Sequence, residues 1–228
     1  MSGLTAGYGP LAVVRDVDFS VGPGEIVGLL GRNGAGKTTT IMAIGGYLGK
    51  YSGSVSVSGT PLTGPPYKRT RSALGLVLEG RSVFATLTVR QNLGLAAAAL
   101  DEALDLFPEL ADKLSLKAGL LSGGEQQMLS LARAVGRKPS VLLIDELSFG
   151  LAPAVCERIF SRLRSVAADS SLGVLLVEQH IHYAASVVDR ALIMAEGAIR
   201  AEFPGADLTA REAEIERLYL GEDFQPAN

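Results

Sequence analysis

The chain has 228 residues, 47% of them hydrophobic, which is enough for one large domain with a substantial core. A net charge of −3 excludes a protein drawn to nucleic acid by its overall field, and a single cysteine excludes a disulfide framework. No apolar stretch reaches the ~18–20 residues of a membrane-spanning helix, and the first ten residues lack the pattern of a secretory signal peptide. We therefore expect a soluble protein of one domain, residues 1–228.

The first strongly predicted elements are a strand, a glycine-rich loop and a helix in direct succession. "EIVGLL" at 25–30 is a short apolar run, typical of a buried parallel strand. The motif G-x-x-x-x-G-K-T follows from Gly31 to Thr38, and a helical pattern covers 37–48. The strand before and the helix after outweigh a chance match in a chain with 27 glycines. This succession predicts a phosphate-binding loop.

The residue types in this loop suit phosphate chemistry. Gly34 and Gly36 can adopt backbone angles closed to other residues, so that successive N–H groups converge on phosphate oxygens. Lys37 supplies a charge between the β- and γ-phosphates, and the Thr38 hydroxyl binds Mg²⁺. The predicted nucleotide-binding residues of the loop are Gly31, Asn33, Gly34, Ala35, Gly36, Lys37, Thr38 and Thr39.

The middle of the chain changes from alternating strands and helices to helices alone. "YKRTR" at 67–71 groups three positive charges and is predicted as a solvated turn or strand edge, and "ALGLVL" at 73–78 as a weaker strand. Residues 84–135 carry a helical pattern and no strand pattern. We expect a helical subdomain there, inserted between core segments 1–83 and 136–200.

"LSGGEQ" at 121–126, called the signature below, opens a helix inside this insertion. Ser122 followed by Glu125 is a capping box, and Ser122, Gly123 and Gly124 expose N–H groups at the helix N-terminus. This is a second anion site in a chain that already has one. One triphosphate hardly needs two cradles from the same subunit, so we expect the signature to cap the γ-phosphate of ATP held by another copy.

A strand after the insertion ends in two carboxylates. "SVLLID" at 140–145 closes with Asp145, and Glu146 follows. Asp145 is predicted to hold Mg²⁺ through water, and Glu146 to polarise the attacking water. The alternative, an acidic pair that merely begins a turn, loses weight beside the phosphate loop.

The rest of the chain restores the alternation. The helical stretch 154–169 is predicted to contain a buried, unreactive Cys156. Runs at 173–178 and 190–197 are predicted strands, so the sequence indicates an α/β fold with a parallel sheet covered on both faces.

A final helix is predicted at 209–220. Thr209 and Glu212 are spaced as a capping box, and Gly221 is placed to end the helix. The apolar residues that would pack its face are Ile215, Leu218 and Tyr219.

With the phosphate loop, the paired carboxylates and the signature in place, the chain resembles the ATP-binding subunits of ABC transporters, whose signature reads LSGGQ or LSGGE. The resemblance covers essentially the whole chain and implies a P-loop NTPase (RecA-like) core, an antiparallel β edge and a helical insertion. It implies Mg²⁺-dependent ATP hydrolysis. It also implies that two subunits bind head to tail and bury two ATPs, each between one phosphate loop and the signature of the other subunit.

The resemblance carries over further positions one at a time. Tyr8 matches the aromatic residue that stacks on adenine, although a core tyrosine is the alternative. Glu79 occupies the place of a Gln that couples the γ-phosphate to the permease, and we expect it near the metal. Leu147 stands where the family usually has Pro, and Ala152 where it usually has Asp.

The switch position, where most members have a His that contacts the γ-phosphate, is irregular. Gln179 falls on it and His180 follows. Gln179 can donate a hydrogen bond but cannot titrate. We favour Gln179 because alternation along the strand points His180 away, and both stay candidates.

Local segments resemble one subgroup, the second ATP-binding subunits of branched-chain amino acid importers. These segments are "LEGR" at 78–81, "SGGEQQMLSLARA" at 122–134, "GLAP" at 150–153 and "VEQ" at 177–179. The implied partners are a second ATP-binding subunit, identical or not, two transmembrane permease subunits and, indirectly, a substrate-binding protein, without nucleic acid. The implied location is peripheral, on the cytoplasmic face of the cell (inner) membrane. Compared with this subgroup, most of the first strand is expected to be missing and the helical insertion to be short.

Two other functions remain open at this point. One is a soluble, non-transport ABC ATPase that works on ribosomes or DNA, although the chain has neither a second cassette nor a long insertion. The other is a degenerate regulatory subunit that binds ATP and barely hydrolyses it, which Leu147, Ala152 and Gln179 keep open.

Overall fold

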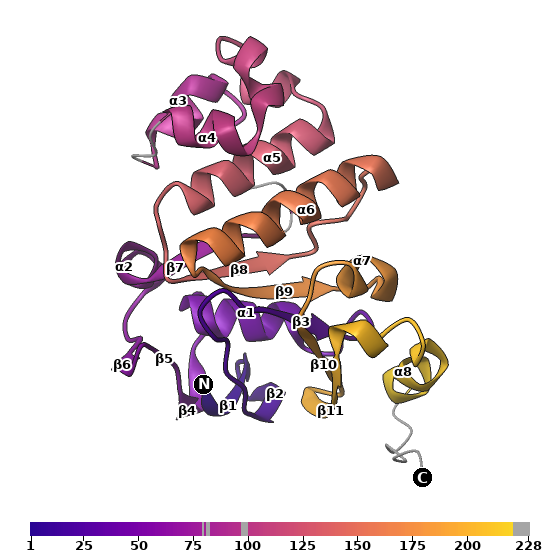
Figure 1. Ribbon diagram of the computed structural model, residues 1–228. Helices are drawn as coiled ribbons and strands as arrows, with labels where there is room; N and C mark the ends of the chain where they lie inside the picture. Colours follow the sequence, from indigo (N-terminus) through magenta and orange to yellow (C-terminus); the bar gives the residue numbers. More distant parts are fainter. Residues whose placement is uncertain (79, 81–82, 97–99, 221–228) are drawn as a thin grey trace.

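A computed structural model describes residues 1–78, 80, 83–96 and 100–220 of the chain. Its centre is a mostly parallel sheet with strand order β11-β10-β3-β9-β8-β7. Helices cover both faces of this sheet (Figure 1). Within the described ranges, no helix combines the length and the apolar character needed to cross a membrane.

The predicted buried strands form the central sheet. They are β3 (Ile26–Leu30), β7 (Leu74–Val77), β8 (Val141–Asp145), β9 (Gly173–Glu178) and β10 (Arg190–Ala195). All pair in parallel, and β11 (Ala198–Pro204) adds an antiparallel edge. The parallel α/β prediction is therefore confirmed. Because the strands are parallel, their carboxyl ends lie along one edge of the sheet, where ligands bind in such folds.

Burial on both faces explains why these strands are apolar throughout. Along β3, Ile26 and Leu30 face one core cluster, and Val27 and Leu29 face the other. Helices α5 (Gly123–Val135) and α6 (Pro153–Ser170) cover the first face, and α1 (Lys37–Gly45) covers the second (Figure 1). Parallel strands buried in this way cannot show polar alternation.

A second, antiparallel sheet lies beside α1. Its order is β2-β1-β4, built from β1 (Ser2–Tyr8), β2 (Leu11–Val17) and β4 (Lys50–Ser54). A short hairpin follows, β5 (Ser56–Val57) with β6 (Thr60–Pro61). The antiparallel edge is confirmed, but the expectation that most of the first strand is missing is wrong. β1 has 7 residues and pairs with strands on both sides.

The basic segment at 67–71 is not a turn or a strand edge, as predicted, but part of helix α2 (Pro66–Ser72). Arg69 is buried rather than solvated. Its guanidinium donates from Nη1 to the carbonyl oxygens of Ala43 and Ile44, at 3.0 and 2.6 Å, near the C-terminus of α1. Burial lowers the pKa of Arg69. The helix dipole favours a cation at that end of α1, which offsets part of the free-energy cost of burying the charge.

The segment predicted as a helical insertion contains α3 (Val89–Gly94), α4 (Leu100–Leu106), short 3₁₀ turns at Pro108–Lys113 and Ala118–Leu120, and then α5. In its described residues the β pairing is an isolated bridge between Thr88 and Lys117. In Figure 1 α3 and α4 lie beyond α5, away from β1 and β2. The subdomain boundaries at 84 and 135 stay a prediction.

The chain continues through α6, where Cys156 is buried as predicted and burial raises the pKa of its thiol. Short elements α7 (Ile181–Ala185) and a 3₁₀ turn at Gly205–Asp207 lead to α8 (Glu212–Tyr219). The capping box predicted at Thr209 is wrong, because α8 begins at Glu212 after Arg211 and has no side-chain cap.

The apolar face of α8 agrees with the prediction. Ile215 and Leu218 are buried, and Tyr219 is partly buried, which raises the pKa of its phenol. Gly221, predicted to end this helix, lies outside the described residues.

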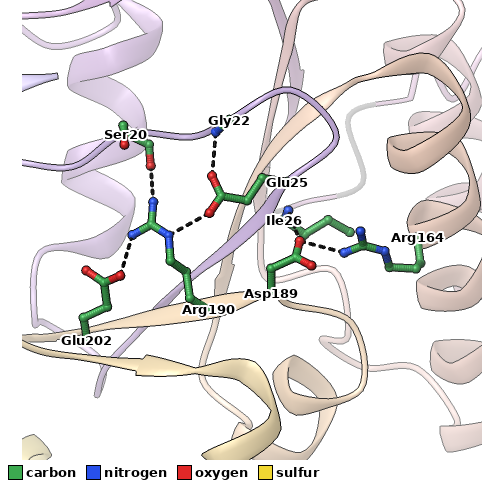
Figure 2. Close-up of polar contacts among 8 residues, drawn as sticks. All are labelled: Ser20, Gly22, Glu25, Ile26, Arg164, Asp189, Arg190 and Glu202. Atoms are coloured by element: carbon green, nitrogen blue, oxygen red, sulfur yellow. Dashed lines mark hydrogen bonds and ion pairs between the residues drawn. The ribbon is translucent and has the colours of Figure 1, made fainter.

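Charged groups join the elements at the amino ends of β3 and β10 (Figure 2). Arg190 donates from Nε to Glu25 at 2.7 Å, from Nη1 to Glu202 at 3.0 Å and from Nη2 to the carbonyl oxygen of Ser20 at 2.6 Å. Glu25 also accepts from the Gly22 N–H at 2.5 Å. One arginine thus links the start of β10 to the start of β3, to β11 and to the loop after β2.

Asp189 makes a second link at this edge (Figure 2). Its Oδ2 accepts from the Ile26 N–H at 2.8 Å and from Arg164 Nη1 at 2.7 Å, so it connects β3 to helix α6. Although partial burial raises the pKa of Asp189, these donors hold it below its ordinary value.

Candidate active site

The glycine-rich loop lies at the carboxyl end of β3, and α1 begins at Lys37. Gly34 and Gly36 have φ of 84° and 110°, in the left-handed region that the sequence predicted for them. Gly31 is required for a different reason, since a Cβ there would lie 2.3 Å from the carbonyl oxygen of Met194. The loop is therefore built for glycine at each of these positions.

Residues outside the motif hold the loop in place. The Gly197 N–H donates to the carbonyl oxygen of Ala35 at 2.9 Å, and the Thr40 hydroxyl donates to that of Gly36 at 2.9 Å. Gly197 lies in the turn between β10 and β11, where a Cβ would come within 1.9 Å of the Val13 carbonyl oxygen. Both contacts escaped sequence reasoning, although the Glu-Gly pair at 196–197 between two strands is a turn signal.

The other predicted loop residues divide by exposure. Asn33, Gly34 and Thr38 are exposed, whereas Ala35 and Thr39 are buried. The Ala35 N–H donates to the Arg32 carbonyl oxygen at 3.1 Å, so this N–H already has a partner within the loop.

Lys37 lies inside the site rather than extending into solvent, with only 5% of its surface exposed. Its Nζ donates to the carbonyl oxygens of Gly31 at 2.7 Å and Arg32 at 3.1 Å. Burial lowers the pKa of Lys37, and the negative charges of Glu146, Asp145 and Glu178 oppose that change. Charged groups of helix α1 and of the ends of β8 and β9 therefore act on one another at this edge of the sheet.

Asp145 ends β8, opposite Val177 of β9, and is buried. Glu146 follows, partly buried, and its N–H donates to the Val177 carbonyl oxygen at 3.0 Å. Glu146 has φ of 49°, a conformation that a residue with a Cβ adopts only when its surroundings hold it there. The structure thus fixes the backbone of the residue predicted to polarise water.

The predicted metal ligands give a donor set that fits Mg²⁺. The carboxylate of Asp145 and the hydroxyl of Thr38 are hard oxygen donors, the type that this ion prefers. Both are associated with Lys37, since Thr38 follows it in α1 and the charge of Asp145 acts on it electrostatically. Glu79, the third predicted ligand, lies outside the described residues.

Glu178 is a site residue that sequence reasoning missed. It ends β9, is 1% exposed, and accepts hydrogen bonds from the N–H and the hydroxyl of Ser148 at 3.0 and 2.8 Å. Burial raises the pKa of Glu178, although these donors and the Gln179 N–H oppose the change. The available signal was a carboxylate at the end of a run that is otherwise apolar, "GVLLVE".

Gln179 and His180 are both exposed. The His180 ring meets the Tyr183 ring edge-on, with centroids 5.8 Å apart, and His180 is the residue before α7. The Gln179 N–H points toward the Glu178 carboxylate and lowers its pKa. The choice of Gln179 as the phosphate contact stays a prediction.

The signature has the predicted capping box. The Ser122 hydroxyl accepts from the Glu125 N–H at 3.4 Å, and Glu125 accepts from the Ser122 N–H at 2.9 Å. The prediction of an exposed N–H at Ser122 is therefore wrong, because the capping box itself uses that group. Glu125 also pairs with Lys113. Gly124 has a packing role besides, because a Cβ there would lie 2.7 Å from Val155 Cγ1 of α6.

The signature helix begins at a shallow pocket of about 310 Å³. Ser122, Gly123 and Gly124 line one side, and Gly150 and Ala152, which follow Asp145 and Glu146 in the chain, line another. The signature and the segment at 150–152 are thus neighbours on this surface.

Tyr8 is 55% exposed at the end of β1, which excludes the alternative of a core tyrosine. The turn that follows it is held by Tyr51, whose hydroxyl donates to the Gly9 carbonyl oxygen at 2.5 Å. An exposed aromatic ring at a fixed turn can stack on a planar base.

Comparison with known proteins agrees with this geometry. The family model for "ABC transporter" matches residues 14–148. The chain is 38% identical to a high-affinity branched-chain amino acid transport ATP-binding protein, BraG, of Pseudomonas aeruginosa, over 94% of this chain and 95% of that one. It is 37% identical to a probable branched-chain amino acid transport ATP-binding protein, LivF, of Archaeoglobus fulgidus, over 96% of each.

More distant matches widen the comparison. The chain is 32% identical to the lipopolysaccharide export system ATP-binding protein LptB of Escherichia coli, over 97% of this chain and 96% of that one. Among solved structures, an ATP-binding subunit of an ABC transporter superposes with a TM-score of 0.80 at 29% identity, covering 96% of this chain and 97% of that one.

Proposed function

The chain belongs to the ABC transporter family, and we propose that it is the ATP-hydrolysing subunit of a branched-chain amino acid importer. Membership brings ATP binding, ATP hydrolysis and the P-loop NTPase fold. The observation that carries the substrate class is the identity of 37–38% to BraG and LivF over almost the whole chain, against 32% to LptB.

In this proposal the phosphate loop holds the triphosphate. Backbone N–H groups between Asn33 and Thr38, other than that of Ala35, donate to phosphate oxygens, and Lys37 places its charge between the β- and γ-phosphates. Tyr8 stacks on adenine. Thr38 and Asp145 would hold Mg²⁺, which neutralises phosphate charge when it is bound. The left-handed glycines and the buried Lys37 support this assignment.

Hydrolysis then depends on Glu146 and on a residue at the switch. The Glu146 carboxylate accepts a hydrogen bond from the attacking water and orients it toward the γ-phosphate. Gln179, at the end of the neighbouring strand, donates a hydrogen bond to a γ-phosphate oxygen. The position of both residues at the carboxyl edge of the central sheet supports these roles.

The signature acts on ATP held by another ATP-binding subunit, identical to this chain or not. The N–H groups of Gly123 and Gly124 lie at the start of α5, where the helix dipole favours an anion, whereas the Ser122 N–H already donates to Glu125. α5 and α1 cover opposite faces of the sheet, which supports a role between subunits rather than within one. Binding of ATP closes the pair, and hydrolysis reopens it.

The membrane partners are two permease subunits, which place the protein on the cytoplasmic face of the inner membrane. A groove of about 180 Å³ between the helical insertion and the core supports this. Its lining combines apolar Tyr47, Leu76 and Leu95 with the cationic Arg133 and Arg137, a surface suited to an amphipathic helix with acidic groups. A substrate-binding protein would contact the permeases and not this chain.

Purification from membranes tests the assignment. Two permeases, a second ATP-binding subunit and an amino-acid-binding protein should copurify with the tagged chain. In that complex ATP turnover should fall at least ~100-fold with Glu146→Gln. If the wild-type complex turns ATP over as slowly as the variant, the chain is a regulatory subunit instead. Copurification of lipopolysaccharide export components, or of ribosomes, would replace the importer by another ABC function.

A further inference from the structure

Glu178 and Ser148 form a buried polar pair beside the proposed catalytic carboxylate. The Ser148 N–H donates to Oε1 of Glu178 at 3.0 Å and the Ser148 hydroxyl donates to Oε2 at 2.8 Å. Ser148 is 6% exposed and Glu178 is 1% exposed. One residue therefore satisfies both oxygens of a carboxylate that has almost no access to water.

The hydrogen bonds between Glu178 and Ser148 hold the turn that contains Glu146. Glu146 is in the left-handed region, and such a conformation persists only where the surroundings determine it. Val177 accepts from the Glu146 N–H at 3.0 Å, and Glu178, the next residue of β9, accepts from Ser148. Two consecutive residues of one strand thus hold the turn on both sides of Leu147.

Packing alone does not account for a carboxylate at this place. The four residues before Glu178 in β9 are Val174, Leu175, Leu176 and Val177, all buried and apolar. A fifth apolar residue would fill the same space without the loss of hydration that a buried carboxylate suffers. The Ser148 carbonyl oxygen is also held, by the Cys156 thiol at 3.8 Å and by the Leu151 N–H at 3.2 Å. Every polar backbone and side-chain group of Ser148 is therefore fixed.

We propose that Glu178 is a positioning residue for ATP hydrolysis, which holds the Glu146 turn through Ser148 and links it to Gln179 at the end of the same strand. The inference rests on the proposed role of Glu146 as the residue that orients water. Its function is geometric: the carboxylate of Glu146 points at the water only while the turn keeps its strained backbone. Because Gln179 directly follows Glu178, a contact between Gln179 and the γ-phosphate would act on the same segment that positions Glu146.

Paired substitutions at Glu178 separate hydrogen bonding from packing. Glu178→Gln keeps the length and can bond both Ser148 groups, because the hydroxyl can turn to accept from the amide. Glu178→Met keeps the length and loses both acceptors. We expect kcat within about threefold of wild type for Glu178→Gln and at least about tenfold lower for Glu178→Met, with KM for ATP within about twofold in both. Glu157→Gln, on the exposed side of α6, is the charge control and should change nothing.

A double-mutant cycle with Glu146→Gln tests whether Glu178 acts through Glu146. Once Glu146→Gln has removed the water-orienting group, Glu178→Met should lower the residual rate by less than about twofold. A full additional loss in that background would overturn the proposal, as would a wild-type kcat in folded Glu178→Met. If Glu146→Gln itself keeps the wild-type rate, the proposed role of Glu146 fails first, which is a distinguishable result.

Ser148→Ala keeps the test decisive if Glu178→Met does not fold. It deletes one hydroxyl and leaves the N–H bond to Glu178 in place. We expect about a threefold lower kcat with unchanged KM and a melting temperature close to wild type. An unchanged kcat in this variant would overturn the proposal, because the hydroxyl would then contribute nothing to the turn.

Discussion

The Nζ atom of Lys37 lies 2.7 Å from the carbonyl oxygen of Gly31, so the lysine charge is held against the first residue of the glycine-rich loop that precedes it. Both residues are buried, and three carboxylates act on the ammonium group from neighbouring strands. If ATP binds at this loop as we propose, the charge is in place before the phosphates arrive, and little reorganisation is needed.

We expect Lys37→Ala to lower kcat/KM for ATP hydrolysis at least ~100-fold, because a buried cation at the phosphates is lost. Steady-state turnover and nucleotide affinity measure the effect. Lys68→Ala, an exposed lysine on α2, is the matched control and should keep wild-type values. Equal turnover in the two variants would contradict the placement of the triphosphate at this loop.

Gly31→Ala should destabilise the fold by about 2–3 kcal/mol, because its Cβ would meet the Met194 carbonyl oxygen at 2.3 Å. Chemical denaturation gives the free energy of unfolding. Gly49→Ala should differ from wild type by less than ~0.5 kcal/mol, since no atom lies within 4 Å of a Cβ there and its φ is not left-handed. Equal losses at the two glycines would argue against the close approach of β10 to the loop.

Ser122→Arg should prevent ATP-dependent pairing of ATP-binding subunits, because a large cation would fill the start of α5 and remove the cap. In a Glu146→Gln background, ATP should produce a paired species by sedimentation, and adding Ser122→Arg should abolish it. ATP affinity of the single subunit should stay within about threefold, since in the proposed arrangement the signature contacts only the nucleotide of the other subunit. If Ser122→Arg abolished ATP binding to the single subunit, the signature would lie at the nucleotide of its own chain, and the two-subunit arrangement would be wrong.

The lowered pKa of Asp189 leads us to expect that the protein loses stability at low pH. Its folded-state pKa lies below the ordinary value of 3.8, so the ionised form stabilises the fold at neutral pH. That contribution is fully present above pH 3.8 and disappears as the pH falls through the lower, folded-state pKa. We expect Asp189→Asn to lower Tm by about 1–2 °C at pH 7, a small effect because the pair with Arg164 is partly exposed and screened. The Tm difference from wild type should shrink below pH 3.8, and a constant difference would contradict the assignment.

The sequence predicted best what is local. The strand, the loop from Gly31 to Thr38 and the following helix are adjacent in the chain. Backbone positions with positive φ favour glycine, so the loop can be recognised from its residue types. The capping box of Ser122 and Glu125 spans three residues and was equally visible. Asp145 could be placed because a buried parallel strand is apolar up to its carboxyl end.

What the sequence could not provide are contacts that depend on strand order. Glu178 and Ser148 lie 30 residues apart, and they meet only because β9 lies next to β8 in the sheet. Arg69 looked solvated because nothing local indicates that the C-terminus of α1 lies beside it. At Thr209 the local spacing suggested a cap, but the described helix begins after Arg211 instead.

Strand β3 has neighbours that come late in the chain. It pairs with β9 on one side and β10 on the other, so Val27 is bonded between Leu175 and Arg190. During translation, a growing chain that stops short of residue 190 has a strand with at least one bare flank and a glycine loop without its clamp at Gly197. The pairing of β3 is therefore completed only after residues 190–197 have been made, and until then the apolar flank of β3 is open to aggregation.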